Sequence, residues 1–260
     1  MTIFGGIEAT RAAVPGHLLL AAGLDPEVIY DTKFGRNADV DAAADVISMG
    51  GDYAGQPVDA NGSMLTVAEN FQLVSANAAD TAAGTGCREV EITYLDNAGR
   101  WSNAAIATNG GALDTGISGI RAFCLRGSRF GSAGSNVGLI TLQHISTTTR
   151  IFATIAAGAG QSQIAAITVP LGYVGVFEKP ALKIDRAGSA TADATYFCRR
   201  EGQNGYVQKQ LLRGSNAEVG EPDPGVMRQP ALTDVKLRIT FVSTTNVDIG
   251  GQFNYCFLKV

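Results

Sequence analysis

Residues 88–95 read Arg-Glu-Val-Glu-Ile-Thr-Tyr-Leu, followed by Asp-Asn-Ala-Gly at 96–99 and by Arg-Trp-Ser-Asn-Ala-Ala-Ile-Ala at 100–107. Apolar and polar residues alternate from Glu89 to Tyr94, so the apolar side chains share one face of a strand and the polar ones share the other. The segment 96–99 favours a hairpin turn, because Asn and Gly accept positive φ at little cost. This stretch therefore predicts a β-hairpin with one solvated face.

The same pattern of strand-like runs and turn residues continues on both sides of the hairpin, from about Met64 to the end of the chain. Short apolar or alternating runs are separated by clusters of Gly, Asn, Asp and Ser, which is typical of sandwiches and barrels. Further strands are expected at residues 101–108, 117–125, 137–145, 150–156, 164–169, 173–178, 181–185, 195–199, 206–212, 234–242 and 252–260. We expect an all-β fold: an antiparallel β-sandwich or a jelly-roll-like body.

Residues 1–62 differ from this body in their pattern. They contain many Gly, Ala and Asp, show little alternation, and have no capped segment with helical periodicity. We expect an extended N-terminal arm over residues 1–62 and the β-sandwich body over residues 63–260.

Charge and apolar patterning exclude two classes of partner. The 260 residues carry a net charge of −4, and the pI is about 5.2, so no electrostatic attraction to a nucleic acid backbone is expected. The longest apolar region, residues 151–177, is interrupted by polar residues at 158–163 and by Pro170, which argues against a membrane span.

The N-terminus lacks the basic start of a secretory signal, which favours synthesis in the cytoplasm.

Four cysteines, Cys87, Cys124, Cys198 and Cys256, lie far apart in the sequence. Their spacing matches neither a metal-ligand motif nor a redox pair. Three of them adjoin aromatic residues in strand-like runs, where a thiol behaves as a small apolar group. We expect all four to be reduced and mostly buried.

No motif for catalysis stands out, and no enzymatic activity, cofactor or metal is expected. Phosphate loops, nucleophile elbows and HExxH zinc motifs are absent from the sequence. His17 and His144 are the two histidines, and His144, on an expected strand, is interpreted as structural rather than as a catalytic base. Asp39, Asp41 and Asp45 lack the spacing of a Ca²⁺ loop and are interpreted as a solvated turn.

A glycosidase pair of carboxylates remains an alternative, because its geometry is set in space rather than in sequence. A saccharide site would also need exposed aromatic side chains, and the chain has one tryptophan, Trp101. Among the 20 basic residues, Arg is more than twice as common as Lys. Arg is enriched at protein interfaces, so this bias indicates either extensive subunit contacts or a codon preference.

Residues 33–41 read Lys-Phe-Gly-Arg-Asn-Ala-Asp-Val-Asp, followed by Asp45-Val46 and by Gly-Gly-Asp-Tyr at 50–53. This segment resembles the N-terminal part of structural proteins from the virions of tailed phages, especially podovirus-like phages of marine and freshwater bacteria. Shorter similar pieces occur at residues 90–96, 166–172, 197–202 and 233–239.

The resemblance implies a virion component that is made in the bacterial cytoplasm. The favoured role is a capsid decoration or cement subunit, a homotrimer that binds and stabilises the shell of the major capsid protein. Two alternatives remain: a neck or tail protein (a spike, fibre base or tube subunit), and a β-sandwich that binds or hydrolyses carbohydrate on the host surface. In the favoured role, the expected capsid contacts are Phe34, Arg36, Asn37, Asp39 and Tyr53.

Overall fold

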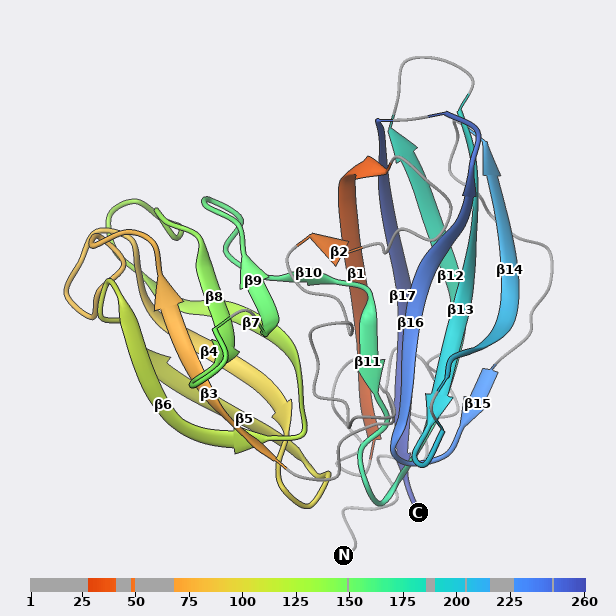
Figure 1. Ribbon diagram of the computed structural model, residues 1–260, viewed down its shortest axis with the longest axis horizontal. Coiled ribbons are helices and arrows are strands. Elements are labelled where there is room, and N and C mark those ends of the chain that lie inside the picture. Colours follow the sequence, from red (N-terminus) through yellow and green to blue (C-terminus); the bar gives the residue numbers. More distant parts are fainter. Residues whose placement is uncertain are drawn as a thin grey trace, which may run out of the picture.

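The computed structural model describes residues 28–40, 48–49, 68–148, 150–185, 190–203, 205–215, 227–244 and 246–260. Every regular element in these ranges is a β-strand, and every pairing between the named strands is antiparallel (Figure 1). The expected all-β, antiparallel fold is confirmed.

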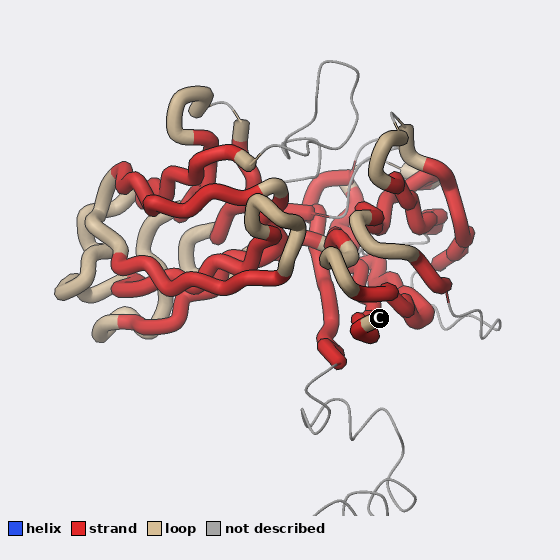
Figure 2. The backbone as a smooth tube through the Cα atoms, turned by 90° about the horizontal axis from the view of Figure 1, so that it is seen from below, coloured by secondary structure: helices blue, strands red, loops and turns tan. Residues whose placement is uncertain are grey.

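The first half of the body is a sandwich of two sheets, seen as two layers in Figure 2. One sheet has the strand order β6-β3-β8-β9 and the other has the order β5-β4-β7. The strands are β3 (Glu69–Ser75), β4 (Cys87–Leu95), β5 (Trp101–Ala107), β6 (Ala112–Gly119), β7 (Arg121–Phe130), β8 (Ile140–His144) and β9 (Ile151–Ile155). Phe71 of β3 packs between the layers against Tyr94 of β4.

A second sandwich follows, with the strand orders β1-β17-β12-β15 and β11-β16-β13-β14. Its strands are β1 (Val28–Val40), β11 (Ala166–Thr168), β12 (Tyr173–Asp185), β13 (Thr191–Arg200), β14 (Val207–Ser215), β15 (Met227–Gln229), β16 (Thr233–Val242) and β17 (Val247–Lys259). A short ladder of β2 (Ser48–Met49) and β10 (Gln163–Ile164) lies beside β1. The described body thus contains two sandwiches, a division that the strand pattern did not indicate.

The expected hairpin is present as β4 and β5. Val90 and Ile92 are completely buried, whereas Glu89 and Glu91 face outward and form ion pairs with Arg129 and Arg126. At the turn, Gly99 has a φ of +74°, and its amide donates to the carbonyl of Asp96 at 3.0 Å. The expected strand, its two faces and its turn are confirmed.

Several strand boundaries differ from expectation: no strand was expected at β3 or β15, and the strand expected at 164–169 is divided into β10 and β11. Two further differences have a local physical reason. The single strand expected at 117–125 is divided at Ile120, because β6 ends at Gly119 and β7 starts in the other sheet. A Cβ on Gly119 would lie 2.5 Å from the carbonyl oxygen of Leu95, so the crossing between layers requires glycine. Conversely, the two strands expected at 173–185 form one strand, β12, which is interrupted by a bulge before Pro180.

Residues 28–40 belong to the second sandwich, although we expected them to be part of an arm. They form β1, which pairs with β17 from Val28 opposite Leu258 to Val40 opposite Val247. The backbone partner lies more than 200 residues away, so local alternation gave no sign of the pairing. Apart from β2, the remainder of the arm expected over 1–62 lies outside the described residues, and the boundary at residue 62 stays a prediction.

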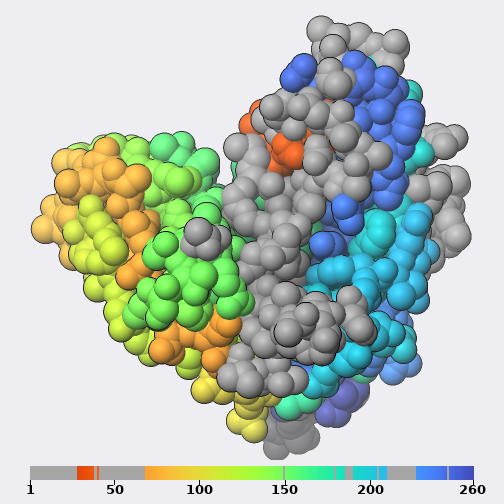
Figure 3. All heavy atoms as spheres, in the orientation of Figure 1, coloured from red at the N-terminus to blue at the C-terminus, as the bar shows by residue number. Residues whose placement is uncertain are grey.

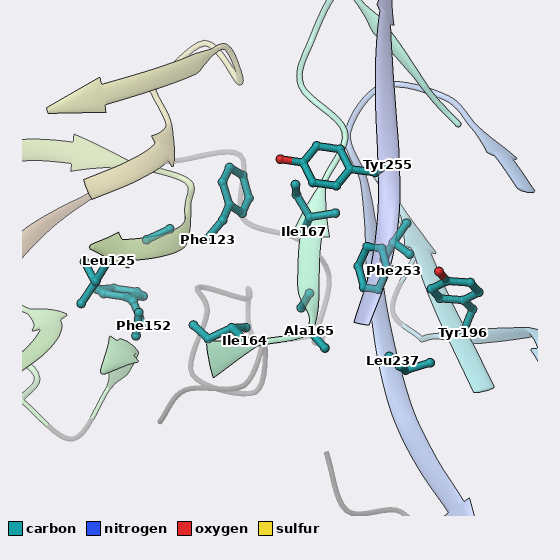
Figure 4. Close-up of a cluster of buried hydrophobic side chains, with 14 of the residues drawn as sticks. Phe123, Leu125, Phe152, Ile164, Ala165, Ile167, Tyr196, Leu237, Phe253 and Tyr255 are labelled. Atoms are coloured by element: carbon teal, nitrogen blue, oxygen red, sulfur yellow. The ribbon is translucent and has the colours of Figure 1, made fainter. Parts of the chain in front are cut away.

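One buried core runs through both sandwiches. Phe123, Leu125 and Phe152 lie in the first sandwich, and Tyr196, Leu237 and Phe253 lie in the second. The connecting segment places Ile164, Ala165 and Ile167 between these two groups (Figure 4). In the space-filling view the sandwiches form a left and a right lobe (Figure 3). The junction between the two sandwiches is therefore packed with buried side chains.

Candidate functional site

A buried ionic cluster fixes one sandwich to the other. The guanidinium of Arg121, at the start of β7, donates to both carboxylate oxygens of Asp234 on β16, at 3.1 and 3.2 Å. Arg199 of β13 donates to Asp234 at 2.8 Å, and the hydroxyl of Thr168 donates to it at 2.6 Å. Arg121 and Asp234 are both 0% exposed. Because Arg121 comes from the first sandwich and the other three from the second, the cluster joins the two.

The charge state of Asp234 follows from these neighbours. Burial by itself raises the pKa of a carboxyl group. Here the charges of Arg121 and Arg199, together with the hydrogen bonds from Arg121 and Thr168, outweigh burial and hold the pKa of Asp234 below its usual value of 3.8. The carboxylate is therefore ionised at neutral pH and balances part of the buried positive charge.

An aromatic bridge adds a second connection. Trp101 of β5 stacks on Phe123 of β7 with ring centroids 5.4 Å apart, and it meets the ring of Phe257 on β17 edge-on at 6.0 Å. Nearby, the amine of Lys33 on β1 donates to the carbonyl oxygen of Phe123 at 2.6 Å. Burial lowers the pKa of Lys33. These contacts hold β1 and β17 against the sheet β5-β4-β7.

A cavity of about 400 Å³ opens beside this bridge, between β1 and the sheet β5-β4-β7. We call it the interlobe cleft. Exposed side chains line its rim: Asp31, Thr32, Asn103 and Arg126. Half-buried side chains line its walls: Phe34, Glu91, Thr93, Trp101, Cys124 and Gln161. Buried residues line its floor: Lys33, Ser162 and Tyr255.

The charges in the interlobe cleft are balanced. Arg126 donates to Glu91 at 2.6 Å, and this contact raises the pKa of the guanidinium. Asp31 at the rim is offset by Lys33 at the floor. Two acidic and two basic side chains thus line the cavity, which gives it a polar surface without a strong field of either sign.

Three of the expected capsid-contact residues, Phe34, Arg36 and Asn37, lie close together on β1. Phe34 lines the interlobe cleft, so part of its surface faces the protein itself. The Nε of Arg36 donates to the two carboxylate oxygens of Asp248 on β17, at 2.8 and 3.1 Å. Asn37 lies opposite Ile249 in the ladder. The side chain of Asp39 and the whole of Tyr53 lie outside the described residues, and the contact role of all five stays a prediction.

The structure also places His144 and the four cysteines, the other residues considered as candidates for chemistry. His144 ends β8, and its Nδ1 accepts hydrogen bonds from the amides of Ser146 and Thr147 at 3.1 and 2.9 Å, which fits a structural histidine. Cys87, Cys198 and Cys256 are buried, whereas Cys124 is half-buried at the cleft wall. His17, Asp41 and Asp45 lie outside the described residues. Within the described ranges, no group of three acidic, His or Cys side chains is arranged to hold a metal ion.

Sequence reasoning missed both the ionic cluster and the interlobe cleft. The lining of the cleft comes from residues between 31 and 255, and Arg121 and Asp234 are 113 positions apart. The one sequence signal for the ionic cluster was that Arg121 and Asp234 stand at the ends of otherwise apolar runs, where a charged side chain needs a partner if it is buried. Nothing in the sequence indicated that these two would meet.

Comparison with known proteins gives little further information. No family model matches the chain, and no curated protein matches it. The similar solved structures include a chain of infectious bursal disease virus strain Gx, which is 9% identical with a TM-score of 0.23, the match covering 89% of this chain and 72% of that one. A chain from the T13 particle of that virus is 8% identical with a TM-score of 0.20 and coverages of 90% and 73%. Scores this low establish no shared fold.

In the ranges that the structure describes, no helix has the length and apolar character needed to cross a membrane.

Proposed function

We propose that the protein is a structural subunit of a phage virion that decorates the capsid, and that it binds and stabilises the shell of the major capsid protein. The observation that supports this role most is the place of the phage-like segment in the fold. Residues 33–40 of that segment lie in β1, where β17 holds them in register. A contact made through β1 would thus be coupled directly to the packed body.

In this role the protein stabilises the shell mechanically, without a chemical reaction. A decoration subunit stabilises a shell by bridging its neighbours, and a modest interface repeated over a lattice gives a large total effect through avidity. The packed junction between the sandwiches suits this role, because a subunit that bridges neighbours must resist being pulled apart. Self-association into a trimer would multiply the contacts of each unit.

The copy number of the protein in purified virions tests this proposal first. We expect a number comparable with that of the major capsid protein, measured by quantitative mass spectrometry of intact particles. A copy number that fits only the unique tail vertex would instead favour the neck or tail role. Absence from virions would refute both structural roles.

A truncation tests how the N-terminal segment contributes. Because β1 is part of a sheet, removing residues 1–60 would leave β17 as an unpaired edge and would perturb the body itself. Removing residues 1–27 spares β1 and every expected contact residue, so we expect a folded protein that keeps most of its affinity for capsids. The measurement is co-sedimentation with capsids stripped of this protein, with circular dichroism as the control for folding. A large loss of affinity in the folded 28–260 chain would show that residues 1–27, and not the segment in β1, make the main contact.

A further inference from the structure

The interlobe cleft combines an aromatic surface with unengaged polar groups, and this chemistry suits a saccharide. We propose that it binds one or two rings of an uncharged oligosaccharide, an activity separate from attachment to a capsid. Its volume of about 400 Å³ lies within the range of roughly 300–1,000 Å³ typical of small-molecule sites. Its position between the two sandwiches resembles the boundaries between packed units where such sites concentrate.

Trp101 supplies the apolar surface. Its ring is half-buried in the cleft wall and is held by the stack on Phe123 and by the edge contact with Phe257. Phe123 covers one face of the ring, so the opposite face is the one assigned to a ligand. The face of an aromatic ring carries partial negative charge and attracts the polarised C–H groups on the flat side of a sugar ring. A ring that is already fixed by packing loses little conformational entropy when a ligand binds to it.

Amide side chains supply the polar contacts. Asn103 at the rim and Gln161 in the wall both line the cleft, and neither side chain has a hydrogen-bond partner within the described part of the protein. Each amide offers an acceptor oxygen and a donor nitrogen side by side. This pairing matches neighbouring sugar hydroxyls, each of which both donates and accepts.

Charge balance selects for an uncharged ligand. Glu91 and Arg126 neutralise one another at 2.6 Å, and Asp31 at the rim faces a cavity whose floor carries Lys33. A phosphate or carboxylate ligand would meet no surplus of positive charge. Hydroxyl groups, in contrast, can use charged oxygens and guanidinium nitrogens as hydrogen-bond partners without adding charge.

The single tryptophan makes the test direct, because all tryptophan fluorescence of the protein comes from Trp101. The full chain is titrated with maltotriose, mannotriose, galactotriose and triacetylchitotriose, and with trigalacturonate as an anionic probe. We expect saturable changes in fluorescence with at least one neutral probe, confirmed by calorimetry, and much weaker binding of trigalacturonate.

Variants locate the binding. The double variant Asn103→Ala with Gln161→Ala should weaken that binding by about tenfold or more, the loss expected from removing two neutral hydrogen bonds. Asn70→Ala is the matched control, since Asn70 is an exposed strand residue in the other sheet of the first sandwich and does not line the cleft. Melting temperatures verify that both proteins are folded.

Three results would overturn the proposal: no binding of any neutral probe, a preference for trigalacturonate, or binding that the double variant leaves unchanged. Capsid co-sedimentation of the same double variant is measured in parallel. Retained capsid binding with lost saccharide binding would support two separate surfaces. Lost capsid binding with intact folding would show that the cleft serves the capsid contact, which contradicts the separation proposed here.

Discussion

Replacing Asp234 with asparagine is expected to lower the free energy of unfolding by about 3–5 kcal/mol, the loss typical of breaking a buried ion pair from one side. The carboxylate is completely buried and accepts from Arg121, Arg199 and Thr168. Asparagine keeps the shape but removes the negative charge, so two guanidinium groups in the junction lose the attraction of this carboxylate. The measurement is chemical denaturation followed by circular dichroism.

Asp248→Asn provides the matched control. Asp248 pairs with Arg36 at the surface, where the arginine side chain is 50% exposed, so the loss should stay below about 1 kcal/mol. Equal losses for the two variants would show that burial of the Asp234 cluster does not matter.

The pH dependence of the free energy of unfolding gives a second test of the role of Asp234. Its pKa is lower in the folded protein than the usual 3.8, so its contribution to stability is complete above that value and disappears as the pH falls through the folded pKa. The wild type should therefore lose stability more steeply than Asp234→Asn below about pH 4. Parallel pH profiles would argue against an ionised Asp234.

Replacing Asp80 with asparagine should cost about 2–4 kcal/mol, from weakened charge-assisted hydrogen bonds and at least one buried N–H left without an acceptor. Asp80 is 0% exposed in the loop between β3 and β4. Its oxygens accept from the amides of Cys87, Val137 and Gly138 at 2.7–2.9 Å, and from the hydroxyl of Ser75 at 2.9 Å. These contacts fasten that loop to the loop between β7 and β8.

The control for this variant is Asp96→Asn in the exposed β4–β5 turn. There a single oxygen of Asp96 accepts from the amides of Ala98 and Arg100. Asparagine retains such an oxygen and is itself favoured in turns, so we expect a change of about 0.5 kcal/mol or less. Thermal and chemical denaturation of both variants measure the difference. A small loss for Asp80→Asn would mean that the amide re-forms the network, contrary to our expectation.

The candidate site was predictable only in its parts. Trp101 was recognised as the one tryptophan, and the acidic residues of β4 were recognised as a solvated face. Their meeting with Asp31 and Lys33 across the interlobe cleft depends on how β1 pairs with β17 and on how the two sandwiches are joined. Sequence spacing carries no information about such an approach, because the residues belong to strands that are not neighbours in the chain.

The sequence by itself determined the all-β class, most strand positions, the two faces of β4 and the turn at residues 96–99. These features depend on steric preferences and on alternation that act within a few residues. Only the tertiary structure decided that β1 joins β17, that the body forms two sandwiches, and that Arg121 meets Asp234. The reason is physical: every strand offers the same backbone hydrogen bonds, so the choice of partner depends on the packing of side chains that are distant in the chain.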